Sequence, residues 1–122
     1  MSKIAWIGTG VMGRQQAGHL VKAGHIVKAY SRRYEAVCQQ AEEFGFLPCA
    51  TIRDAVADAE FVFVMVGYPT DVEQVFCGPK GILENAPAGA VVVDMTTSSP
   101  TLAQKLYALG KEKGIAVMDA PV

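Results

Sequence analysis

The chain has 122 residues, of which 51% are hydrophobic and 19% charged, and its formal net charge is −1. This length fits one domain with a single core, and two full domains would be cramped. The near-neutral charge excludes a general electrostatic attraction to nucleic acid or anionic lipid, and no apolar run approaches eighteen residues. We therefore expect a globular protein without a nucleic-acid partner and without a membrane span.

Cysteine usage and the N-terminal sequence favour a cytoplasmic protein. Cys38, Cys49 and Cys77 are odd in number and widely spaced, which matches neither a disulfide framework nor a zinc pattern. The apolar-rich run after the first three residues is too short for a signal peptide. His19 and His25 lack the spacing of metal ligands, so we expect no metal site.

Short apolar runs alternate along the chain with segments of helical periodicity. Strands are predicted over residues 4–7, 26–30, 47–49, 61–66, 91–93 and 116–120, and helices over about 10–23, 34–44, 52–57 and 100–113. The run 61–66 contains no polar residue, which is typical of a strand in the middle of a parallel sheet covered by helices.

This alternation predicts an α/β fold of the Rossmann type. Parallel neighbours need crossover helices, and these pack on both faces of the sheet, which gives three layers, α/β/α, with strand order 3-2-1-4-5-6. Ligands of such doubly wound sheets bind beyond the carboxyl ends of the strands, beside the first strand. The candidate site residues are therefore those that follow each strand.

A glycine-rich segment follows the first predicted strand. Gly8-Thr9-Gly10-Val11-Met12-Gly13 fits G-x-G-x-x-G, a pattern that arises by chance in roughly 4% of chains of this length. Its position between a strand and a helix makes it specific for a dinucleotide, because the glycines permit a tight turn and a close approach of the pyrophosphate. The alternative is a turn with three ordinary glycines.

The end of the second predicted strand indicates which dinucleotide binds. An NAD site normally has an acid there for the adenosine ribose, whereas this chain has Ser31, Arg32 and Arg33. These side chains suit a 2′-phosphate, with the arginines giving charge-assisted hydrogen bonds. We expect NADP(H) to be preferred over NAD(H); the alternative is a solvated basic turn before the next helix.

Four motifs in order resemble the N-terminal half of the β-hydroxyacid dehydrogenases, a family that includes 3-hydroxyisobutyrate dehydrogenase, tartronate semialdehyde reductase and relatives of 6-phosphogluconate dehydrogenase. The motifs are GTGVMG, KAGHIV from Lys22, DMTTSSP from Asp94 and DAPV at the end of the chain. The resemblance implies a cofactor site in which residues 8–13 contact the pyrophosphate and Ser31 with Arg32 surround the adenosine ribose. It also implies that Val66 and Gly67 line the nicotinamide-ribose side and that Thr97 lies near the nicotinamide.

The same resemblance implies where the chemistry takes place. In the family a lysine on a following helical domain acts as general acid and base on a small 3-hydroxy acid or its semialdehyde, and the Ser-Gly-Gly that usually follows DAPV helps to bind the substrate. Neither is in this sequence, and Lys105, Lys111 and Lys113 fit the solvated face of the last helix. We expect residues 1–122 to be a dinucleotide-binding domain that binds cofactor and is truncated before that helical domain. We assign no catalytic residue within it.

Two other classes fit parts of the pattern. A stand-alone nucleotide-binding module that senses a redox cofactor or CoA and acts through a partner would use the same glycine turn. A methyltransferase would use a similar sheet, but it normally has an acid where this chain has Ser31.

Overall fold

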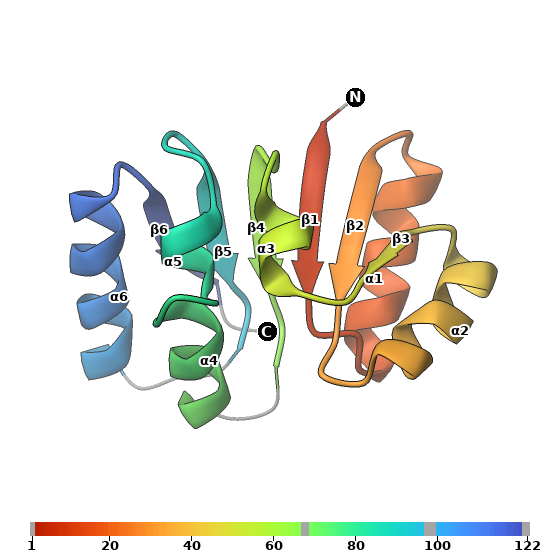
Figure 1. Ribbon diagram of the computed structural model, residues 1–122, viewed down its shortest axis with the longest axis horizontal. Coiled ribbons are helices and arrows are strands. Elements are labelled where there is room, and N and C mark those ends of the chain that lie inside the picture. Colours follow the sequence, from red (N-terminus) through yellow and green to blue (C-terminus); the bar gives the residue numbers. More distant parts are fainter. Residues whose placement is uncertain (1, 67–68, 97–99, 121–122) are drawn as a thin grey trace.

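The computed structural model describes residues 2–66, 69–96 and 100–120 (Figure 1). Its strands are β1 (Lys3–Ile7), β2 (Ile26–Tyr30), β3 (Leu47–Cys49), β4 (Phe61–Val64), β5 (Val91–Asp94) and β6 (Ala116–Asp119). Its helices are α1 (Val11–Lys22), α2 (Tyr34–Phe44), α3 (Ile52–Val56), α4 (Pro69–Phe76), α5 (Ile82–Asn85) and α6 (Pro100–Glu112).

The strands form one parallel sheet in the order β3-β2-β1-β4-β5-β6. This is the predicted Rossmann-type order, and it is confirmed. Because the strands are parallel, their carboxyl ends lie along one edge, toward which the arrowheads point in Figure 1. From β1 the chain adds β2 and β3 on one side of the sheet and then β4, β5 and β6 on the other side. The strand order therefore changes direction at β1, and the turn after β1 lies at this switch point.

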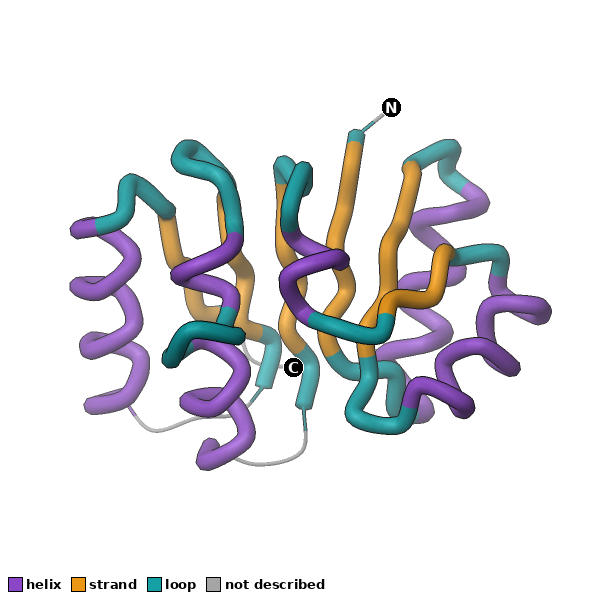
Figure 2. Tube along the Cα trace, viewed as in Figure 1, coloured by secondary structure: helices purple, strands orange, loops and turns teal. Residues whose placement is uncertain are grey.

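Alternating side chains of β1 enter two separate cores. Ala5 and Ile7 belong to the core under α3, α4, α5 and α6, whereas Ile4 and Trp6 belong to the core under α1 and α2. Figure 2 shows helices on both sides of the sheet, which gives the predicted three layers. A strand covered on both faces is apolar along its buried length, and this is why β4, and β1 after the exposed Lys3, lack the polar alternation of a half-exposed strand.

Two helices between β4 and β5 were not predicted by residue range. These are α4 and α5, and α5 has only four residues, too few to show a helical period. The predicted strand 61–66 was too long, because β4 ends at Val64. Met65 N still donates to the Ile7 carbonyl oxygen (2.9 Å), but Val66 N donates to a side chain, the Thr96 hydroxyl (2.9 Å), so the ladder stops there.

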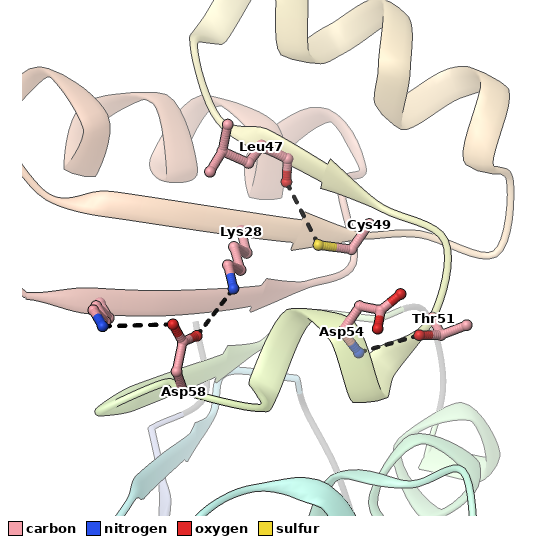
Figure 3. Close-up of polar contacts among 7 residues, drawn as sticks. Lys28, Leu47, Cys49, Thr51, Asp54 and Asp58 are labelled. Carbon is pink, nitrogen blue, oxygen red and sulfur yellow. Dashed lines mark hydrogen bonds and ion pairs between the residues drawn. The ribbon is translucent and has the colours of Figure 1, made fainter.

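A cluster of surface charges joins the amino-terminal edges of β1 and β2 to the segment before β4 (Figure 3). The Asp58 carboxylate lies 3.0 Å from Lys28 Nζ and 3.6 Å from Lys3 Nζ. The two lysines hold the pKa of Asp58 below its ordinary value, chiefly through the hydrogen bond from Lys28. This cluster lies at the edge opposite the strand ends and therefore serves the fold and not the candidate site.

Candidate dinucleotide-binding site

The glycine turn between β1 and α1 has two positions at which a side chain would collide with the backbone. Gly8 has a φ of +104°, and a side chain there would collide with the carbonyl oxygen of Met65. A side chain on Gly13 would collide with the carbonyl oxygen of Gly8. Around Gly10, by contrast, a Cβ would meet no atom within 4 Å. Gly8 and Gly13 are thus required for the close packing of the turn, whereas Gly10 leaves open space at the surface.

The N-terminus of α1 faces this open space. Gly10 is its N-cap residue, has an extended backbone and makes no side-chain capping bond. The first intrahelical bond joins Arg14 N to the Gly10 carbonyl oxygen (2.9 Å), so the N–H groups of Val11, Met12 and Gly13 precede it. With no acid in its first turn, the helix directs these N–H groups and its positive dipole end at the turn, an arrangement suited to an anion.

The end of β2 lies directly beside the turn. Gly8 N donates to the carbonyl oxygen of Tyr30 (2.9 Å), which brings the residues after β2 to the glycine segment. Ser31 is half-buried, and its Oγ accepts a hydrogen bond of 3.4 Å from Arg33 N. Arg32 and Arg33 are exposed. The carboxyl ends of β1 and β2 therefore bring the N-terminus of α1 and the two arginines after β2 into one region.

One cavity of about 510 Å³ unites these segments. Every predicted site residue that the structure describes lines it: Gly8, Thr9, Gly10, Val11, Met12, Gly13, Ser31, Arg32, Arg33 and Val66. Among its described lining residues there is no aspartate and no glutamate. The two other predicted site residues, Gly67 and Thr97, lie outside the described residues.

The cavity also has lining residues that the sequence reasoning missed. Ile7, Tyr30, Met65 and Val75 complete its wall. The first three flank predicted positions, so the strand ends could have indicated them. Val75 lies on α4, a helix for which the sequence analysis gave no range, and only the fold brings this buried side chain to the glycine turn.

The segments after β4 and β5 are joined by a chain of hydrogen bonds next to the cavity. Thr96 Oγ1 accepts a bond of 2.9 Å from Val66 N, and Thr96 N donates a bond of 2.9 Å to Asp94 Oδ1. Asp94 and Thr96 are buried, at 2% and 5% exposure. Sequence reasoning assigned neither residue, although an aspartate that ends an apolar strand is a recognisable signal.

Two lysines on or next to α6 form ion pairs with glutamates. Lys105 Nζ lies 3.0 Å from the Glu73 carboxylate, and this pairing raises the pKa of Lys105. A general base needs the opposite shift, toward neutrality. Lys113, just beyond α6, pairs with Glu84 at 2.9 Å. Both lysines are thus engaged in ion pairs at the surface.

Other features of the described regions do not resemble a cofactor site. A smaller cavity of about 290 Å³ lies between α6 and β6, away from the glycine turn, and contains no basic side chain among its described lining. Within residues 2–66, 69–96 and 100–120, no three or more His, Cys, Asp or Glu side chains gather as a metal site would require. No helix in these ranges combines the length and the apolar character needed to cross a bilayer.

The strand order, the glycine turn and the cavity define a Rossmann-type dinucleotide-binding domain. The family model described as the NAD binding domain of 6-phosphogluconate dehydrogenase matches residues 3–122. The chain belongs to this family, and it is a domain that binds a nicotinamide dinucleotide. The resemblance stated from its motifs is thereby confirmed.

Similar proteins are oxidoreductases. The chain is 44% identical to an uncharacterized oxidoreductase of Bacillus subtilis, over 98% of this chain and 41% of that protein. It is 36% identical to the 3-sulfolactaldehyde reductase of Escherichia coli, over 100% of this chain and 41% of that enzyme.

A solved structure supports the same family at the level of the fold. The 3-hydroxyisobutyrate dehydrogenase of Mycobacterium tuberculosis, determined with L-serine, superposes with a TM-score of 0.88 at 30% identity. The match covers 100% of this chain and 40% of that one. The chain thus spans about two fifths of the length of the relatives it matches.

Proposed function

We propose that this chain is the NADP(H)-binding domain of an oxidoreductase that transfers hydride between nicotinamide and a small 3-hydroxy acid or its semialdehyde. The observation that carries the proposal is the single cavity in which the glycine turn meets Ser31, Arg32 and Arg33, with no carboxylate in its described lining. The domain itself contributes binding and orientation, and residues 1–122 are proposed to act with a helical substrate domain.

The residues present fit a dinucleotide diphosphate. Space above Gly10 allows the pyrophosphate to approach the backbone, and the N–H groups at the start of α1 are positioned to donate to it. A diphosphate can therefore bind to a chain of net charge −1 without a lysine in the turn. Thr9, Val11 and Met12 supply the remaining wall of the turn.

The 2′-phosphate of NADP(H) is assigned to the end of β2. Ser31 can donate to it, and the guanidinium groups of Arg32 and Arg33 can form charge-assisted bonds with it. Each such bond is worth about 1.5–3 kcal/mol, which is about tenfold or more in affinity. An NAD-specific site would instead present an acid to the ribose hydroxyls, and that acid would repel the 2′-phosphate.

The nicotinamide half is assigned to the β4 side of β1, where Val66 lines the cavity. The family resemblance assigns Gly67, which follows Val66 in the sequence, and Thr97, which follows Thr96, to the same half. The bound cofactor supplies C4 of nicotinamide, which accepts or gives hydride, while the hydroxyl proton needs a general base. We assign that base to a lysine beyond residue 122. This chain is therefore expected to bind cofactor without turnover.

Titration of the purified chain with NADPH and with NADH, followed by cofactor fluorescence, tests the proposal. We expect NADPH to bind at least tenfold more tightly than NADH. Equal affinities, or no binding of either, would contradict it. Arg32→Asp is expected to lower the NADPH affinity at least tenfold and to leave that for NADH nearly unchanged.

Arg53→Asp is the matched control for that charge reversal. Arg53 is an exposed arginine on α3 that does not line the cavity. Arg53→Asp changes the net charge by the same amount as Arg32→Asp, so a general electrostatic effect on NADPH affinity would appear in both variants. An equal loss of NADPH affinity in the two would refute a specific contact from Arg32.

A further inference from the structure

The carboxyl ends of β1, β4 and β5 are tied together by contacts that do not belong to the sheet ladder. Val66 N donates to Thr96 Oγ1 (2.9 Å), and Thr96 N donates to Asp94 Oδ1 (2.9 Å). Next to Val66, the carbonyl oxygen of Met65 lies so close to Gly8 that no side chain fits there. A buried aspartate is thus linked through two hydrogen bonds to the cavity wall that faces the glycine turn.

The burial of Asp94 and Thr96 makes the loss of either hydrogen bond costly. Asp94 and Thr96 are shielded from water, so a broken bond leaves a polar atom that water does not readily satisfy. Val66 N lies beyond the last ladder position of β4, and it donates its hydrogen bond to the Thr96 hydroxyl in place of a backbone carbonyl of a neighbouring strand. The position of Val66 is therefore set by a side chain from the neighbouring strand end.

We infer that Asp94 and Thr96 are positioning residues for the nicotinamide half of the cofactor. Neither side chain is among the described lining of the cavity, whereas Val66 and Met65 are. Asp94 fixes Thr96, Thr96 fixes Val66, and Val66 with Met65 forms the wall on the β4 side of the turn. This inference rests on the proposed function, which assigns the adenosine half to β2 and the nicotinamide half to β4.

Two probes separate the halves of the cofactor. NADPH occupies both halves, whereas adenosine 2′,5′-bisphosphate contains no nicotinamide. We expect Thr96→Val, which keeps the shape but removes the acceptor for Val66 N, to weaken NADPH binding about tenfold and to leave adenosine 2′,5′-bisphosphate binding unchanged. Thr96→Ser retains the hydroxyl and should keep NADPH affinity within about twofold.

Thr51→Val is the matched control. The Thr51 hydroxyl also accepts a backbone N–H bond, from Asp54 at 3.1 Å, but at the start of α3 and outside the cavity (Figure 3). Its loss should affect stability without changing the affinity for either probe. Asp94→Val should give the pattern of Thr96→Val, and the double variant should lose little more than either, because both break one chain of bonds.

Amide hydrogen exchange of Val66 in the unliganded chain tests the bond without cofactor. It should be slow in the parent chain and in Thr96→Ser, and fast in Thr96→Val. Rapid exchange of the Val66 amide in the parent chain would overturn the inference. So would a Thr96→Val variant that loses affinity equally for both probes, or one whose NADPH affinity is unchanged. A parent chain that binds neither probe would instead refute the proposed function, on which the inference depends.

Discussion

The indole Nε1 of Trp6 donates a hydrogen bond of 2.9 Å to the carbonyl oxygen of Gly8. Trp6 is 2% exposed and stacks on Phe63 of β4, with ring centroids 5.4 Å apart. The core on the α1 side therefore extends a side-chain donor into the glycine turn. The same carbonyl oxygen limits the space at Gly13, so one buried tryptophan helps to set the conformation of the whole turn.

Replacement of Trp6 by phenylalanine should destabilise the chain and weaken cofactor binding. An aromatic ring would be kept, but the Gly8 carbonyl would lose its donor, at a cost of about 1–3 kcal/mol in the free energy of unfolding. Urea unfolding and NADPH titration measure the two effects. Phe63→Leu, which keeps the hydrogen bond and loses the ring contact, should lower stability alone; equal affinity in Trp6→Phe and the parent would contradict the role of the bond.

Alanine at Gly10 should affect chiefly cofactor binding, whereas alanine at Gly13 should affect chiefly stability. The Gly10 φ of −65° suits alanine and its surroundings are open, so Gly10→Ala should fold with a loss of at most about 1 kcal/mol. Its methyl group would stand where the pyrophosphate approaches, and cofactor affinity should fall more than about tenfold. Retained affinity in a folded Gly10→Ala would contradict the assigned diphosphate position.

Gly13→Ala forces a methyl group against the carbonyl oxygen of Gly8. Because backbone has to move, we expect the free energy of unfolding to fall by about 1–3 kcal/mol. Thermal unfolding without cofactor is the measurement, since it separates this effect from binding. A Gly13→Ala chain as stable as the parent would show that the turn relaxes without cost.

The ion pairs of Asp58 should make a small part of the stability depend on pH. Because the folded state lowers the pKa of Asp58, chiefly through Lys28, this contribution is present above the unfolded pKa of about 3.9 and is lost as the pH falls through the folded pKa. Asp58→Asn should cost about 0.5–1 kcal/mol near pH 7, since the pairs are partly exposed.

Urea unfolding of parent and Asp58→Asn across the acid range measures this contribution. The difference between them should shrink as the pH falls below about 4. Glu42→Gln, a change at an exposed carboxylate on α2, is the control and should leave stability nearly unchanged. A difference that grows toward acid would contradict the sign assigned to the Asp58 shift.

Two cysteines should react slowly with alkylating reagents. Burial raises the pKa of the Cys49 thiol and of the Cys77 thiol, so both carry less thiolate than an exposed cysteine at about pH 8. Timed iodoacetamide labelling, read by mass spectrometry, should show modification that accelerates in concentrated urea. Equal rates in the folded and unfolded chain would exclude protection by burial.

The local sequence determined most of the fold and the centre of the site. Continuous apolar runs require burial on both faces, and parallel neighbours are joined by crossover helices that pack on both faces, so the three layers follow from the pattern. The strand order was expected from the Rossmann type to which the glycine turn points. The glycines at 8, 10 and 13 and the basic pair after β2 are likewise local signals, because the turn and helix that use them are contiguous in sequence. These residues line one cavity.

Only the tertiary structure decided how distant strand ends meet. Val66 and Thr96 are 30 residues apart, and no periodicity in either segment shows that a hydroxyl on one would end the ladder of the other. Trp6 reads in the sequence as one more apolar residue, yet its indole N–H reaches the turn that follows it. Such contacts depend on the register between strands and on side-chain direction, which arise from packing of the whole sheet.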